Sequence, residues 1–236
     1  MKAVVLAGGK GARLAPYTTT VPKPLMPLGD KPILDVIIRQ LRRHGIEEIT
    51  LSVGHMAELI MAHFGDGARH GVRIEYSREE EPLGTAGPLS LIPCLNERFL
   101  VMNGDILTTL DLGGMLAGHA GSGAICTMAV TTHRVAVDLG VVEYDAQCQL
   151  AGYQEKPVKN FRVSMGVYIF EPRALGFIPR ARHLDLPGLM HRLMQAGETV
   201  RCHPFEGYWL DIGRPDDYAR AQADFETIEP LIFQRA

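Results

Sequence analysis

The sequence predicts an α/β fold with a Rossmann-like, mostly parallel mixed sheet flanked by helices. Three observations lead to this prediction. A wholly apolar run covers residues 3–7 and stops at Gly8 and Gly9, which is typical of a strand buried on both faces of a sheet. An amphipathic helical pattern follows between Pro32 and Gly45. Strand and helix patterns then alternate along the first half of the chain, as they do in βαβ units.

The first half contains the clearest elements. Apolar residues at Leu34, Ile37, Ile38 and Leu41 recur at i, i+3, i+4 and i+7, the spacing of one face of a helix. The other elements expected here are a strand at 49–53, a helix at 56–64, a strand at 72–76, a helix at 84–91 and a strand at 99–102.

The second half has a different texture and predicts a smaller α+β part. The ranges 124–131, 140–144 and 163–170 are expected to be strands separated by polar turns, and 219–225 is expected to be a helix. No Ser/Gly-rich or Pro-rich linker and no internal repeat divides the chain. We therefore expect one domain over residues 1–236, in one compact body, with its halves meeting near residue 122.

Composition excludes several classes of protein. The chain has 24 Lys and Arg against 27 Asp and Glu, a net charge of −3, so no basic footprint predicts nucleic acid or an anionic membrane as a partner. The four cysteines stand far apart, which argues against structural zinc and a disulfide scaffold. No HExxH spacing, signal peptide or membrane-spanning run is present, and a soluble, cytoplasmic protein is expected.

The glycine-rich segment at 8–14 is the first candidate binding element. Glycines after a buried strand let backbone N–H groups converge on an anion. The P-loop pattern is absent, and Leu14 stands where a dinucleotide fingerprint needs glycine. Four cations precede the first acidic residue, and this local charge favours a polyphosphate ligand over a plain glycine turn. The four are Lys2, Lys10, Arg13 and Lys23.

Two linked motifs, LAGGKGARL and PKPLMPLGDKPIL, resemble the signature of the sugar-1-phosphate nucleotidyltransferases, also called nucleotide-sugar pyrophosphorylases. The resemblance covers nearly the whole chain in the family's order and implies the nucleotide-diphospho-sugar transferase fold. Its further motifs are EEPLGTAG at 80–87, NGD at 103–105, QEKP at 154–157, GVY at 166–168 and WLDIG at 209–213. One departure is Ala12, where the family commonly has Ser or Thr.

The resemblance implies attack of a sugar-1-phosphate oxygen on the α-phosphorus of an NTP, giving an NDP-sugar and pyrophosphate. Since the nucleophile is already an anion, positioning and charge neutralisation are expected to carry catalysis. Arg13, Lys23 and Asp105 are the expected catalytic residues. The expected nucleotide-binding residues are Leu6, Ala7, Gly8, Gly9, Gly11, Glu80, Gly84 and Thr85.

Mg²⁺ is the implied cofactor, and Asp105 and Asp211 are its expected ligands. Asp105 follows the apolar run 99–102 at the carboxyl end of a strand, and two carboxylates with phosphate oxygens and water suit Mg²⁺. Asp211 has an alternative role, as a cap of the helix that follows Pro215.

The implied sugar-phosphate site contains Gly140, Glu155, Lys156 and Gly166. Lys156 resembles the family lysine that holds the phosphate, and Glu155 would accept hydrogen bonds from sugar hydroxyls. The alternatives are a surface ion pair for these two residues and strand glycines that bend the sheet for the other two.

The segment 79–89 is especially similar to mannose-1-phosphate guanylyltransferases. Guanine presents adjacent N–H donors that acidic side chains can accept, so GTP is favoured, with mannose or a manno-heptose as the sugar. Thymidylyl or uridylyl transfer to glucose 1-phosphate is the near alternative. A glycosyltransferase would need a DxD pair near Asp105, and a non-catalytic sensor would have lost the charged residues. No hexapeptide β-helix extension is recognised. The sequence leaves a homodimer open as the assembly of this catalytic domain.

Overall fold

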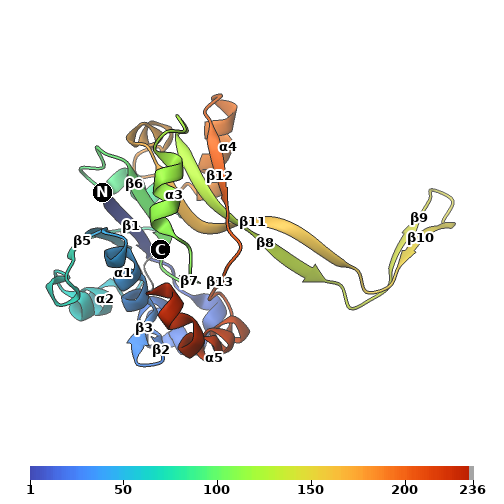
Figure 1. Cartoon of the computed structure of the whole chain (residues 1–236), viewed down its shortest axis with the longest axis horizontal. Helices are drawn as coiled ribbons and strands as arrows, with labels where there is room; N and C mark the ends of the chain where they lie inside the picture. The colour runs from blue at the N-terminus through green and yellow to red at the C-terminus, as the bar shows by residue number, and fades with distance from the viewer. Residues whose placement is uncertain (234–236) are drawn as a thin grey trace.

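The computed structural model describes residues 1–233. Its centre is a seven-stranded sheet in the order β12-β8-β11-β6-β1-β4-β5 (Figure 1). The strands are β1 (Lys2–Ala7), β4 (Glu48–Val53), β5 (Arg73–Arg78), β6 (Phe99–Asn103), β8 (Cys126–Ala136), β11 (Val158–Phe170) and β12 (Val200–Pro204). All neighbours are parallel except that β11 runs antiparallel to both β6 and β8. The predicted mixed, mostly parallel sheet is confirmed.

Helices and short strand pairs complete the molecule. The α-helices are α1 (Ile33–Arg43), α2 (Ala57–Phe64), α3 (Leu112–His119), α4 (Leu186–Gln195) and α5 (Pro215–Ile232). The strand pairs are β2 (Pro27–Leu28) with β3 (Lys31–Pro32), β7 (Ile106–Thr108) with β13 (Trp209–Asp211), and β9 (Val141–Tyr144) with β10 (Leu150–Gln154). Short 3₁₀ helices lie at Ala12–Leu14, Tyr17–Thr19, Lys23–Leu25, Ala68–His70, Gly87–Leu91 and Pro172–Phe177. Within residues 1–233, no helix is both long and apolar enough to cross a membrane.

The sheet is buried on both faces because β1 points side chains into two separate cores. Val5 packs in the core that α1, α2, α3 and α5 cover, whereas Val4 packs in the core formed with α4 and the 3₁₀ helices at Gly87–Leu91 and Pro172–Phe177. Both valines are fully buried. Because both faces of β1 are buried, the run at 3–7 is apolar throughout and does not alternate with polar residues, as the sequence predicts.

The α1 helix forms where its apolar spacing predicts. It begins at Ile33, directly after Pro32, and the chain leaves it through Gly45 at φ +74°. Its buried polar residue Gln40 donates from Nε2 to the carbonyl of Thr108 at 2.8 Å. This contact ties α1 to the chain just after β7, and so to the region that follows β6.

The segment 84–91 differs from its prediction, because only Gly87–Leu91 is helical and that stretch is 3₁₀. Gly84 has φ +76°, and the N–H groups of Ala86 and Gly87 both donate to the carbonyl of Leu184. The left-handed backbone of Gly84 lies outside the α-helical region, so an α-helix cannot include this residue. The C-terminal helix, expected at 219–225, is longer and begins at Pro215.

An arm, defined here as residues 131–163, projects from the rest of the molecule, which we call the body (Figure 1). Its inner part is the continued pairing of β8 with β11, from Thr131 opposite Val163 to Ala136 opposite Val158. Its outer part is the β9–β10 hairpin. The sequence analysis expected one compact body and did not predict that residues 131–163 project from it.

Candidate active site

A pocket of about 1,170 Å³ opens at the carboxyl ends of β1, β4 and β6. This is the edge where ligands bind in open α/β sheets. Eleven of the predicted site residues line it: Leu6, Ala7, Gly8, Gly9, Gly11, Arg13, Lys23, Glu80, Gly84, Thr85 and Asp105. Residues from four separate motifs therefore meet in one cavity.

The glycine loop reaches this pocket through two close backbone approaches. A Cβ on Gly8 would lie 3.0 Å from Glu79 Oε1, and the Gly8 carbonyl accepts a hydrogen bond from the N–H of His55 at 3.2 Å. Gly11 has φ +62°, and a Cβ there would lie 2.9 Å from Thr18 Cγ2. A Cβ on Gly9, by contrast, would meet nothing within 4 Å, so Gly9 faces open space.

Lys23 and Asp105 form the charged centre of the pocket. The Lys23 ammonium donates a hydrogen bond to Asp105 Oδ2, and only 9% of the lysine is exposed. Lys23 is the first residue of a short 3₁₀ helix and is followed by Pro24. Asp105 is in the turn between β6 and β7. Burial strengthens such a pair, since less solvent screens it.

Asp211 lies beside Asp105 without itself lining the pocket. The N–H of Ile212 donates to the Asp105 carbonyl at 3.0 Å, and Asp211 is opposite Ile106 in the β13–β7 pair. Burial raises the pKa of the Asp211 carboxyl above its ordinary value of 3.8, the negative charge of Asp105 raises it further, and Lys23 and Arg13 partly oppose both effects. Two carboxylates thus share a partly buried space.

Three buried oxygens around this pair have no hydrogen-bond partner among the described residues: Asn103 Oδ1, Asp105 Oδ1 and Asp211 Oδ1. Hard oxygen donors left unpaired in this way fit Mg²⁺, which keeps several waters and is held by one or two carboxylates plus phosphate oxygens. Consistent with this partial ligand set, residues 1–233 contain no cluster of three His, Cys, Asp or Glu that could enclose a metal. The alternative capping role of Asp211 is not observed, because Asp217 accepts the hydrogen bond from the N–H of Arg214 at the start of α5.

Arg13 lies beside Gly213, on the side of the pocket where the chain leaves Asp211. Its guanidinium is 3.4–3.5 Å from the position that a Cβ on Gly213 would occupy, an ordinary van der Waals contact that places the two residues side by side. Gly213 follows Asp211 by two residues. The arginine, the lysine and the two aspartates therefore converge, although they come from four motifs.

The acidic segment contains one ordered and two exposed glutamates. Glu79 accepts hydrogen bonds from Ser52 Oγ at 3.2 Å and from the N–H of Leu83 at 2.9 Å, so both of its oxygens are engaged. Glu80 and Glu81 are exposed at the pocket. Thr85, predicted to bind nucleotide, uses its hydroxyl to accept the N–H of Leu186 at 2.7 Å, which holds the loop against α4.

Sequence reasoning missed the side chains at the carboxyl ends of β4 and β5. Ser52, His55 and Arg78 line the pocket, and Arg78 also pairs with Glu58 at 2.6 Å. Gly54, directly after the buried strand, was the available signal, since a Cβ there would lie 2.9 Å from the Gly8 carbonyl oxygen. A glycine at the end of a buried strand marks a close backbone approach.

The four predicted sugar-phosphate residues are divided between the body and the arm. Gly166, at φ +74°, is next to the pocket, because a Cβ there would lie 2.6 Å from Asn103 Nδ2. Gly140, Glu155 and Lys156 belong to the arm and do not line the pocket. On the arm, Tyr153 donates to Glu155 Oε2 at 2.9 Å.

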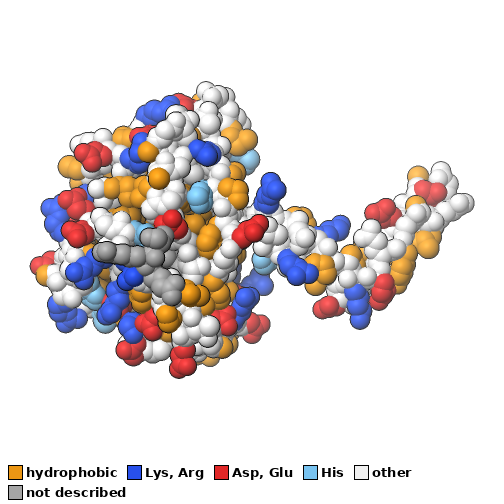
Figure 2. Space-filling model, in the orientation of Figure 1, with side chains coloured by type: hydrophobic (Ala, Val, Ile, Leu, Met, Phe, Trp, Pro, Cys, Tyr) orange, Lys and Arg blue, Asp and Glu red, His pale blue; other side chains and the backbone are white. Residues whose placement is uncertain are grey.

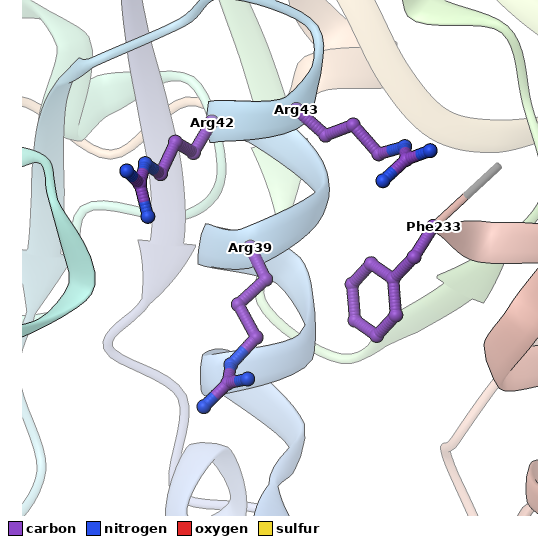
Figure 3. Close-up of a pocket in the computed structure, with 4 residues that line it drawn as sticks. All are labelled: Arg39, Arg42, Arg43 and Phe233. Carbon is purple, nitrogen blue, oxygen red and sulfur yellow. The ribbon is translucent and has the colours of Figure 1, made fainter. Parts of the chain in front are cut away.

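A second hollow, of about 400 Å³, lies on the outer face of α1 and is lined by Arg39, Arg42, Arg43 and Phe233 (Figure 3). Arg43 extends toward the side of Phe233, whereas Arg42 points to the opposite side of the helix. Arg39 is engaged with Asp35 at 2.7 Å. The hollow contains none of the predicted site residues.

Comparisons with known proteins show the family to which the chain belongs. A family model described as nucleotidyl transferase matches residues 2–228. A UTP–glucose-1-phosphate uridylyltransferase of Synechocystis is 36% identical over 241 residues, covering 94% of this chain and 62% of the relative. The catalytic subunit beta of a Danio rerio mannose-1-phosphate guanylyltransferase is 36% identical over 227 residues, covering 92% and 62%. The chain thus spans 62% of the length of each of these curated relatives.

A solved structure shares the fold. It is a Bacillus anthracis protein with the provisional name glucose-1-phosphate thymidylyltransferase, in complex with sucrose. The TM-score is 0.75 at 25% identity, and 94% of each chain is covered.

Proposed function

Since this chain belongs to the nucleotidyl transferase family, we propose that it transfers a nucleotidyl group from an NTP to a sugar 1-phosphate. A phosphate oxygen of the sugar forms a bond to the α-phosphorus, the bond from that phosphorus to the bridging oxygen of the β-phosphate breaks, and pyrophosphate leaves with the electron pair. The observation that carries the proposal is the Lys23–Asp105 pair beside the glycine loop in one pocket. No residue has to act as a covalent nucleophile.

In this proposal the glycine loop binds the triphosphate with its backbone N–H groups, and Gly9 faces the space it would fill. Arg13 and Lys23 neutralise charge that grows on the phosphate oxygens and on the leaving pyrophosphate. Asp105 positions Lys23, and Asp105 and Asp211 would together hold Mg²⁺. When bound, this ion supplies Lewis-acid stabilisation of the phosphate oxygens.

Guanine is the favoured base. Glu80 and Glu81 offer exposed carboxylates at the pocket, and these can accept the N1–H and N2–H₂ donors that uracil and thymine do not present together. The guanylyltransferase relatives support GTP with a manno-configured sugar. The uridylyltransferase relative of equal identity supports the alternative, UTP or dTTP with glucose 1-phosphate.

The test measures pyrophosphate release with GTP, UTP, dTTP, CTP and ATP against a panel of sugar 1-phosphates, with Mg²⁺ present. We expect the highest kcat/KM for GTP with mannose 1-phosphate or a manno-heptose 1-phosphate. Preference for UTP or dTTP with glucose 1-phosphate would select the alternative. No release with any pair would reject the proposed reaction.

A further inference from the structure

The arm presents an apolar face that its own chain does not cover. In the β9–β10 hairpin, Tyr144 is paired with Leu150 and Val142 with Tyr153, so all four side chains are on one face. Their exposed fractions are 69%, 67%, 50% and 60%, in that order. Figure 2 shows apolar side chains gathered along one edge of the outer arm. A two-stranded hairpin is marginal in water, and such a surface marks an interaction site.

The arm also carries Lys156, which the proposed reaction needs at the pocket. Lys156 is the residue we assign to the sugar phosphate, yet it lies just before β11 begins at Val158. The β8–β11 ladder is paired at Ser164 and continues outward to Val158. At about 3.3 Å per residue, those six residues place Val158 roughly 20 Å farther out than Ser164. Lys156 therefore lies away from the pocket of its own chain.

The pocket itself lacks the charge that two phosphorylated substrates require. Its lining carries equal numbers of cations and carboxylates: Lys10, Arg13, Lys23 and Arg78 against Glu79, Glu80, Glu81 and Asp105. A sugar phosphate alone brings about two negative charges at neutral pH. The Mg²⁺ proposed at Asp105 and Asp211 would offset part of this charge, and a cation from outside the pocket lining would offset the rest.

The paired strands of the arm resist folding back onto the same chain. The pairs from Thr131 opposite Val163 to Ala136 opposite Val158 follow one another without a register shift. A bend within this stretch would break hydrogen bonds of the ladder, each worth about 0.5–1.5 kcal/mol, so the place for a bend is the base of the arm, where the register shifts between Ser164 and Tyr168. A second chain can meet the arm as it stands.

We propose that two copies of the chain pair through their arms, and that Lys156 of each copy binds the sugar phosphate in the pocket of the other. This rests on the proposed function. The exchange is reciprocal, as a two-fold axis requires. The segment between Arg13 and Lys23, two residues that line the pocket, also exposes the apolar side chains of Tyr17 and Val21, which offer a surface to the partner's apolar face.

The test uses heterodimers made by co-expressing two differently tagged chains and purifying on both tags in turn. The first pairs Lys23→Ala with Lys156→Ala. If the arm acts on the partner, one site combines an intact body with an intact arm, and the heterodimer should have about half of the wild-type dimer's activity. If the arm acts on its own chain, both sites are defective and activity should stay at the level of the single variants.

The matched heterodimer pairs the double variant Lys23→Ala/Lys156→Ala with wild type, and its expectations are reversed. Both heterodimers are assayed at a sugar phosphate concentration well below the KM of wild type. Exchange then leaves each site with one defective part and activity at the level of the single variants, whereas arms acting within a chain leave one site intact and half the activity. The opposite outcomes also show whether the variants fold. A first heterodimer at the level of the single variants, with a half-active second one, overturns the proposal.

Sedimentation provides a readout that needs no activity. The wild-type chain should be a dimer, Leu150→Lys should shift it toward monomer, and the exposed hairpin-turn control Gln147→Lys should not. A monomeric wild type, or a Leu150→Lys variant as dimeric as the control, overturns the pairing. If no NTP and sugar phosphate react, the proposed function fails, while sedimentation still decides the pairing.

Discussion

Lys23 donates a hydrogen bond to Asp105 across 82 positions of sequence, and the lysine is almost fully buried. The pair joins the 3₁₀ helix after the glycine loop to the turn that follows β6. Each partner is therefore positioned by the other before any substrate arrives, which is the preorganisation that electrostatic catalysis requires.

Arg13→Ala and Lys23→Ala should each lower kcat by about 10²–10³, with a smaller change in KM. The reason is that both cations would act on charge that is greatest in the transition state. Steady-state kinetics with both substrates varied would measure this. Arg69→Ala, an exposed cation of the body, is the control and should keep wild-type kinetics. A variant at position 13 or 23 with wild-type turnover would contradict the assignment.

Asp105→Asn and Asp211→Asn should each abolish turnover and weaken its dependence on Mg²⁺. An amide keeps the size of the side chain and removes the charge that attracts the cation. Circular dichroism should report an unchanged fold. Asp216→Asn, in the first turn of α5, is the matched control. Full activity of the wild-type protein in excess EDTA would refute the metal site.

The Asp211→Asn variant should be more stable than wild type without Mg²⁺. Burial and the charge of Asp105 hold the folded pKa of Asp211 above 3.8, so the unfolded chain loses this proton first as the pH rises. Ionisation therefore lowers stability from about pH 3.8 upward until the folded pKa is passed. A gain of about 1 kcal/mol at pH 7 would raise Tm by about 2–4 °C.

Two further melts check this explanation. The difference in Tm should shrink as the pH is lowered through 3.8, because both states carry the proton below that pH. Mg²⁺ should raise the Tm of wild type more than that of the variant. A variant less stable than wild type at pH 7 without Mg²⁺ would show that the carboxylate is stabilising.

Lys156→Ala should leave GTP binding unchanged and raise the apparent KM for the sugar 1-phosphate by about ten- to a hundredfold. The lost charged hydrogen bond is worth roughly 1.5–3 kcal/mol, and each ~1.4 kcal/mol is a factor of ten. Calorimetry with GTP alone and kinetics with varied sugar phosphate separate the two effects. Equal losses for both ligands would mean that the two phosphate sites have been exchanged.

Gly9→Ala and Gly11→Ala should fail in different ways. Gly11 has a left-handed backbone and no room beside Thr18, so an alanine there should cost about 1–2 kcal/mol of stability. Gly9 has open space, so its alanine variant should melt like wild type but raise the KM for the NTP by intruding on the phosphates. Thermal melts and kinetics on both variants decide this, and a stable Gly11→Ala enzyme would be the contrary result.

Much of the body follows from local sequence pattern. The run at 3–7 and the spacing of α1 are strong because burial on two faces, or on one helical stripe, leaves a periodic record in the sequence. Glycine motifs at strand ends likewise placed most of the pocket. The 3₁₀ turn at Gly87–Leu91 was missed because the apolar spacing does not show that Gly84 has a left-handed backbone, with its loop held to the distant carbonyl of Leu184.

The direction of the arm could not be predicted in the same way. Its strand segments Thr132–Ala136 and Val158–Arg162 mix polar, charged and apolar residues, so neither shows a face that points to a core. Pairing between residues that are far apart along the chain creates them. Lys156 could thus be recognised by its motif, but no local pattern says into which pocket it reaches.

The seam between β6 and β11 has a consequence for synthesis on the ribosome. The strands β6, β1, β4 and β5 all come from the first 122 residues and are neighbours in the sheet, while β11 arrives later. Until then a nascent chain presents β6 as an open edge, and its residues Phe99–Met102 are buried only in the finished sheet. An uncovered apolar edge invites pairing with other chains and aggregation. Pairing of β11 with β6 is therefore the step that removes this edge from contact with other chains.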